Sequence, residues 1–177
     1  AGRAVGGGRA RRVARPLETA RTAAALLDAV AVMDRLRSPG GCPWDAEQTH
    51  ASLARYAIEE GHEVAEAAES GTPAELAEEL GDLLLQVLFH ARVAQEAADD
   101  EAFDLADVAE GLAAKLRRRH PHVFDPAGSA VADADGVRAL WNDIKAAERA
   151  GKPAARASVL DGVPEELPAL MRAQKVL

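Results

Sequence analysis

The spacing of apolar residues along the chain is mainly that of α-helices, and it is clearest between residues 72 and 98. One apolar stripe with steps of three and four residues is formed there by Leu76, Leu80, Leu83, Leu84, Val87 and Ala91. Thr72, Pro73 and Glu75 precede it as a cap, a first-turn proline and a capping-box partner. The sequence therefore predicts a helix from Thr72 to about Ala98 whose stripe borders the core.

Four more helices are predicted by the same periodicity and by residues that start or stop helices. They run from about Leu17 to Arg37, from His50 to Ser70 after the cap Thr49, from Leu105 to Arg119 after the cap Asp104, and from Asp135 to Ala150. Residues 42–45 are predicted as a loop, and residues 167–177 resemble the start of a further helix. The predicted fold class is therefore all-α, a bundle of about five helices with antiparallel core helices.

Three regions are expected along the chain. Residues 1–16 are rich in Gly, Ala and Arg and lack an apolar period, so they predict a disordered tail or linker. Residues 17–150 are expected to form one helical domain. Residues 151–177 are expected to be a linker followed by the start of the further helix.

Composition and charge narrow the possible functions. Aromatic residues make up only 3% of the 177 residues, which fits helices better than strands. The formal net charge of −8 argues against stable nucleic-acid binding, which needs a basic surface. Cys42 is the single cysteine, so no disulfide forms within the chain, and no apolar run is long enough to cross a membrane. A cytoplasmic protein without membrane contact is expected.

Two pairs of acidic residues on the second and third predicted helices are the main candidates for chemistry. Glu60 and Glu63 are three residues apart on one helix face, and Glu79 and Asp82 repeat that spacing on the next helix. A short turn joins the helices, so they should pack antiparallel with the pairs facing each other. Such carboxylates repel one another unless a cation intervenes, and oxygen ligands favour Mg²⁺ or Mn²⁺.

Two other interpretations of these acidic residues remain open. The glutamates could simply form a solvated helix face, which is common in acidic proteins. Glu59 and His62 also have the helical spacing of di-iron ligands, but that site requires a second Glu-x-x-His, and the third helix has Glu79-x-x-Asp82 instead.

Several further segments, taken in order with the acidic ones, resemble the MazG-type nucleoside triphosphate pyrophosphohydrolases. The segments are GGCPWDAEQTHASL (40–53), EEGHE (59–63), EELGDLLLQVLFHAR (78–92), KLRRRHPHVF (115–124), WNDIKAAE (141–148) and SVLDGVPEELPAL (158–170). The resemblance covers about residues 27–177. It implies an all-α fold whose protomers pair into a dimer. Leu84 and Leu88 lie beyond the stripe that one neighbour would cover, which agrees with such pairing through the helices of residues 50–98.

The resemblance also implies a role for each candidate site residue. It assigns Mg²⁺ binding to Glu60, Glu63, Glu79 and Asp82. Glu59 is implied to position a second ion or the attacking water. Phosphate and nucleotide contacts are implied for Lys115, Arg119, Trp141 and Lys145.

These roles agree with simple chemistry, although each has an ordinary structural alternative. Lys115 and Arg119 lie one turn apart, as do Trp141 and Lys145, so each pair shares a helix face. The basic residues could instead stabilise the end of a helix, and Trp141 could be a core residue. Trp44 either contacts the nucleobase or packs beneath the site loop, and packing is favoured.

The expected reaction is Mg²⁺-dependent attack of water on the α-phosphorus of an NTP or dNTP, which releases the nucleoside monophosphate and pyrophosphate. The resemblance implies a role in removing unwanted nucleotides. The alternative is a catalytically silent helical module that dimerises or binds nucleotide. A measurement of pyrophosphate release would distinguish the enzyme from the silent module.

Overall fold

The computed structural model describes residues 16–98, 100–125, 131, 133–150, 163–164, 167 and 169–176, and within these residues all regular secondary structure is helical. The helices are α1 (Pro16–Arg37), α2 (Pro43–Glu47), α3 (His50–Ser70), α4 (Pro73–Ala94), α5 (Leu105–Arg119), α6 (Pro121–Phe124), α7 (Ala134–Ala150) and α8 (Ala169–Val176). The all-α prediction is confirmed. The predicted tail falls almost entirely outside the described residues, and so does most of the predicted linker.

Two short helices correct the predicted count of about five. Residues 42–45 were expected to form a loop, but α2 begins at Pro43, whose ring suits the first position of a helix. The Ala46 N–H donates to the Cys42 carbonyl over 3.1 Å and closes its first turn. A second short helix, α6, begins at Pro121.

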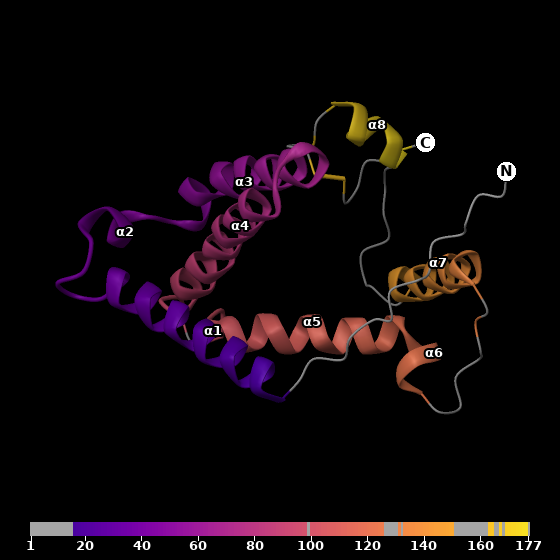
Figure 1. Cartoon of the computed structure of the whole chain (residues 1–177), viewed down its shortest axis with the longest axis horizontal. Coiled ribbons are helices and arrows are strands. Elements are labelled where there is room, and N and C mark those ends of the chain that lie inside the picture. The colour runs from indigo at the N-terminus through magenta and orange to yellow at the C-terminus, as the bar shows by residue number, and fades with distance from the viewer. Residues whose placement is uncertain are drawn as a thin grey trace, which may run out of the picture. The chain divides into compact units, whose positions relative to one another are not determined.

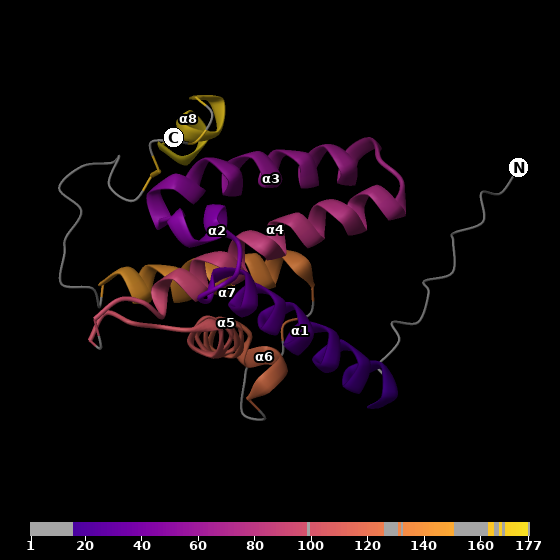
Figure 2. The same cartoon turned by 90° about the vertical axis from the view of Figure 1, so that its left-hand side faces the viewer.

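The α3–α4 hairpin is the best-predicted part of the fold. Thr49 caps α3, and Thr72 caps α4 in a capping box with Glu75. Gly71 lies between the helices and donates its N–H to the Ala67 carbonyl over 2.9 Å. A Cβ on Gly71 would lie 2.8 Å from the Ala67 backbone, so the tight turn requires glycine. Figures 1 and 2 both show α3 and α4 side by side and antiparallel.

The chain divides into two compact units, residues 1–111 and 112–177, and the boundary lies within α5. In the first unit, the core is formed by Met33 of α1, Leu53 of α3, and Leu88 and Phe89 of α4, all of which are buried. This core corrects the predicted stripe on α4, because Leu80 and Val87 are 49% and 39% exposed. The reason is that α4 contacts both α1 and α3, so its buried positions do not form one stripe.

An ion-pair cluster joins the ends of α1 and α4 in the first unit. Arg37 donates to both carboxylate oxygens of Glu96 over 2.8 and 2.9 Å, and Arg92 donates to Asp34 and Glu96 over 2.8 and 2.9 Å. Arg37 and then Arg92 hold the pKa of Glu96 below its usual value. Helix α4 ends at Ala94 rather than at the predicted Ala98, and Glu96 lies in the turn that follows. The acidic residues that follow would also oppose the dipole of a longer helix.

The second unit contains the end of α5, together with α6, α7 and α8. The observed bounds of α7 and α8 agree with the predicted ones within two residues. None of the helices in the described ranges is long and apolar enough to cross a membrane.

Candidate functional site

Three of the four predicted metal ligands come together in the seam between α3 and α4. Glu60 on α3 and Glu79 and Asp82 on α4 each offer a carboxylate oxygen, and these oxygens lie within 4.8 Å of one another. Glu60 and Glu79 are half-buried, whereas Asp82 is exposed. The antiparallel hairpin therefore produces the juxtaposition that the spacing of the acidic pairs predicted.

The remaining two acidic candidates lie beside this group. Glu63 contacts the carboxyl group of Glu60 and also lines a groove with Glu79 near the α3–α4 turn. Glu59 is exposed and lies close enough to Arg55 and Glu60 to influence both electrostatically. Glu63 therefore lies next to the three carboxylates, although it is not one of the group whose oxygens lie within 4.8 Å of one another.

The electrostatics of the cluster are those of carboxylates that lack counter-charges. Burial, followed by the negative charges of Glu63 and Asp82, raises the pKa of Glu60. The pKa of Glu79 is raised for the same reasons in the same order. Both groups would therefore be stabilised by a nearby positive charge. The donor set consists of oxygen only and carries several negative charges, so it fits a hard divalent cation such as Mg²⁺ or Mn²⁺.

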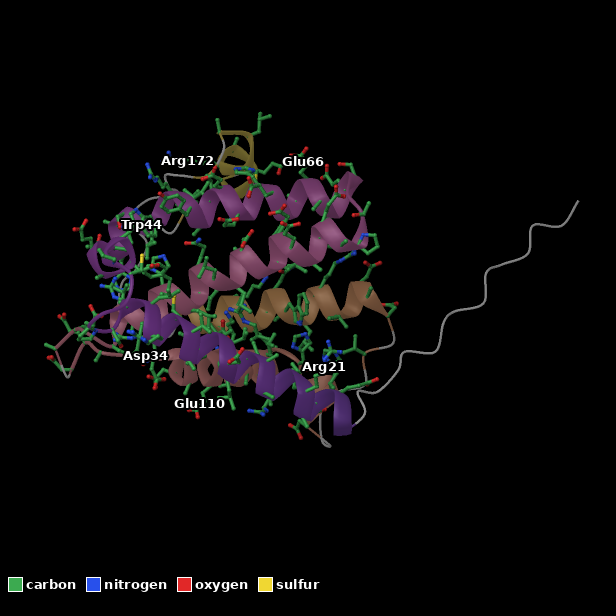
Figure 3. All side chains as sticks on the ribbon, turned by 60° about the vertical axis from the view of Figure 1, so that its left-hand side comes forward. Arg21, Asp34, Trp44, Glu66, Glu110 and Arg172 are labelled. Atoms are coloured by element: carbon green, nitrogen blue, oxygen red, sulfur yellow. The ribbon has the colours of Figure 1, made fainter. Side chains whose placement is uncertain are left out.

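Aromatic residues border the opposite end of α3. Trp44 on α2 contacts Tyr56 and Phe89 edge-on, with ring centroids 6.3 and 6.4 Å apart, and its side chain remains 52% exposed. Figure 3 labels Trp44 beside the first turns of α3 and Glu66 toward the other end of that helix. The structure thus agrees with the favoured packing role of Trp44 and leaves about half of the ring open to a ligand.

The face of α4 that meets α3 continues beyond the predicted acidic pair with two polar residues that the sequence analysis missed, Gln86 and His90. Glu79, Asp82, Gln86 and His90 follow one another at helical spacing on this face. His90 stacks on His50 of α3, with 5.1 Å between centroids and 2.8 Å between the Nδ1 atoms. Burial and then the proximity of His50 lower the pKa of His90. The spacing of three, four and four residues was the available signal, but it lay behind the stronger apolar stripe.

The other predicted substrate residues lie in the second unit, with Lys115 and Arg119 on α5 and Trp141 and Lys145 on α7. The Nζ atom of Lys145 lies 5.9 Å from the centroid of the Trp141 ring, and the edge of His120 lies against the same ring at 5.0 Å. Arg119 donates from Nη2 to Glu148 over 2.7 Å, while Lys115 is exposed. The proximity of Trp141 and Lys145 is therefore observed, and Glu148, which the sequence analysis did not single out, connects α7 to Arg119.

Fold and site together define an all-helical protein with a carboxylate cluster on a helical hairpin that can hold a divalent cation. Residues 48–124 match the MazG nucleotide pyrophosphohydrolase domain, and this match spans the α3–α4 hairpin, α5 and α6. The chain belongs to the MazG family through this domain.

Relatives and a solved structure agree with this assignment. The chain is 49% identical to the nucleoside triphosphate pyrophosphohydrolase of Escherichia coli (strain K12), over 82% of this chain and 53% of that protein. It is 51% identical to the protein of the same name from Mycolicibacterium smegmatis, over 86% and 44% of the two chains. The chain thus spans about half the length of these relatives. The crystal structure of a mazG-related protein from Thermotoga maritima matches 70% of this chain and 98% of its own, with a TM-score of 0.52 and 28% identity.

Proposed function

We propose that this protein hydrolyses nucleoside triphosphates, ribose or deoxyribose, to the nucleoside monophosphate and pyrophosphate with the help of Mg²⁺, for which Mn²⁺ can substitute. The observation that carries the proposal is the carboxylate cluster of Glu60, Glu79 and Asp82, whose oxygens lie within 4.8 Å of one another. The names of the similar proteins from Escherichia coli and Mycolicibacterium smegmatis support the same reaction.

In the proposed mechanism, Glu60, Glu63, Glu79 and Asp82 would hold the cation, which supplies positive charge against the phosphate oxygens. Glu59 is placed one residue before this set on α3 and would accept a hydrogen bond from the attacking water, so that its oxygen is directed at the α-phosphorus. The water oxygen would form a bond to the α-phosphorus while one of its protons passes to the Glu59 carboxylate, and the bond between the α-phosphorus and the oxygen of the leaving pyrophosphate would break. Because no covalent intermediate is needed, catalysis is mainly orientation and charge stabilisation.

Nucleotide contacts are also proposed for residues of the second unit, as the resemblance to the MazG-type enzymes implies. Lys115, Arg119 and Lys145 would contact phosphate oxygens, and the guanidinium group can donate two parallel hydrogen bonds to one phosphate. Trp141 and the open part of the Trp44 ring are the candidates for stacking on the base.

We further propose that the protein is a homodimer or a larger homo-oligomer. The sequence predicted pairing through the helices of residues 50–98, and we now extend the proposed surface to α1. Val32 of α1 is 53% exposed, and Leu80 and Leu85 of α4 are 49% and 41% exposed. Together with Leu36, Leu84 and Leu88, two of these residues line an apolar groove between the helices. A second copy covering this surface would remove the apolar area from water.

Pyrophosphate release tests the enzymatic proposal. The protein is incubated with a panel of NTPs and dNTPs in Mg²⁺ or in EDTA, and both the monophosphate and pyrophosphate are quantified. Equimolar products in Mg²⁺ and none in EDTA are expected. Nucleotide binding without products would instead identify the silent regulatory module. Release of inorganic phosphate and a diphosphate would place the cleavage at the wrong bond.

A further inference from the structure

Glu148 contacts two residues of the second unit, Arg118 and Arg119, to which the sequence did not connect it. One of its carboxylate oxygens accepts a hydrogen bond from Nε of Arg118 over 2.8 Å, and the other accepts one from Nη2 of Arg119 over 2.7 Å. A longer contact of 3.4 Å runs from Nε of Arg119 to the first oxygen. These two guanidinium groups lower the pKa of Glu148 to about 2, with Arg119 contributing most. The carboxylate is therefore ionised throughout the neutral range.

The helical position of Glu148 places it with the proposed nucleotide-binding residues. Trp141, Lys145 and Glu148 follow one another at steps of four and three residues, so all three lie on one face of α7. The end of α5 meets the same face of α7, because Arg119 contacts Glu148 and the next residue, His120, contacts Trp141. The contact with Glu148 thus holds the guanidinium group of Arg119 against the face of α7 that carries Trp141 and Lys145.

The hydrogen-bond geometry leaves part of Arg119 available to a ligand. A guanidinium group has five N–H donors, and Glu148 faces Nε and Nη2. Nη1 of Arg119 makes no hydrogen bond to any residue that the structure describes, and the side chain remains 29% exposed. Two guanidinium groups share the one carboxylate, so the group keeps a net positive charge. A phosphate can therefore meet Arg119 on its free side without replacing Glu148.

We propose that Glu148 is a positioning residue that holds Arg119 ready for the phosphates of the substrate. An arginine side chain loses rotamer freedom when it is fixed, and this loss weakens ligand binding unless the fold has already imposed it. The contact with Glu148 already restricts the rotamers of Arg119 before the ligand binds. The inference rests on the proposed function in one respect, the contact of Arg119 with phosphate.

The test measures binding of inorganic tripolyphosphate by calorimetry in Mg²⁺, which requires neither turnover nor knowledge of the preferred base. Glu148→Ala should weaken this binding roughly three- to tenfold. Glu148→Gln keeps the size and the acceptor oxygen, so it should restore part of the loss. Arg118→Ala is the matched control, because it removes the other partner of Glu148 and leaves the contact with Arg119 in place. The affinity of Arg118→Ala for tripolyphosphate should be within about twofold of that of Arg118→Lys, which keeps the positive charge at this position.

Thermal unfolding and steady-state kinetics complete the test. A positioning role predicts that KM is higher in Glu148→Ala than in the wild type and intermediate in Glu148→Gln. These changes in KM should not parallel the melting temperatures of the variants. Unchanged tripolyphosphate affinity in both variants would mean that Glu148 only makes a structural contact between α5 and α7, and it would refute the positioning role. Tighter binding would show that Glu148 competes with phosphate, which also overturns the proposal. A wild-type protein that binds tripolyphosphate but never releases pyrophosphate would refute the proposed reaction alone.

Discussion

Replacing Glu60 with glutamine should change stability in opposite directions with and without Mg²⁺. Glutamine keeps the size of the side chain and removes one negative charge from the cluster. Glu60 and Asp82 have carboxylate oxygens within 4.8 Å, and two unit charges at that distance in bulk water repel by about 0.9 kcal/mol. Physiological salt, with a screening length of about 8 Å, reduces this to roughly 0.5 kcal/mol. The high dielectric is appropriate because Asp82 is exposed.

This repulsion sets the expected melting temperatures. Relief of about 0.5–0.9 kcal/mol should raise the melting temperature of Glu60→Gln in EDTA by about 1–3 °C. With Mg²⁺ at roughly one hundred times its dissociation constant, the wild type gains about 2.7 kcal/mol from binding. The variant gains less, because one ligand is lost. The order of the two melting temperatures should therefore reverse when Mg²⁺ replaces EDTA.

The assay combines thermal unfolding in EDTA and in Mg²⁺ with pyrophosphate release. Turnover should fall by at least about a hundredfold, as expected when charge stabilisation is lost. Glu69→Gln is the matched control, because Glu69 is exposed on α3 and lies on the opposite face from Glu60. It should behave like the wild type in every measurement. A clear drop in the EDTA melting temperature of Glu60→Gln would mean that Glu60 belongs to a stabilising ion-pair network, and the argument would fail.

Three further outcomes are expected. Trp141→Ala should raise KM at least about fivefold through lost stacking, while melting changes little; unchanged KM with a collapsed melting temperature would make Trp141 a core residue. The pKa of His90 is lowered, mainly by burial. Below about pH 6.5 the unfolded chain therefore binds more protons than the folded protein, and the stability of the protein decreases as the pH is lowered. His90→Gln should flatten this fall between about pH 7.5 and 5.5, and a wild-type slope would contradict it. Leu85→Glu should convert a dimer to a monomer in light scattering, whereas a monomeric wild type at micromolar concentration would disprove pairing.

Local features of this protein could be read from the sequence because they depend on residues within one turn of each other. Thr72 and Glu75 define a helix start through hydrogen bonds that span three residues, and the structure contains both bonds. Glu79 and Asp82 share a helix face for the same geometric reason. The short turn at Gly71 then determines that the acidic pair of α3 faces that of α4, so the carboxylate cluster was predictable as well.

Only the tertiary structure decided which faces of the helices are buried and which charged groups pair. The periodicity of α4 permits several apolar faces, and Leu88 and Phe89 are buried because α1 and α3 approach from two sides. Arg37 of α1 and Glu96, which lies just after α4, pair across 59 residues of sequence, and the local residue spacing around them does not indicate this contact. Contacts between distant residues depend on how whole helices pack, whereas caps and helix faces depend on the local backbone alone.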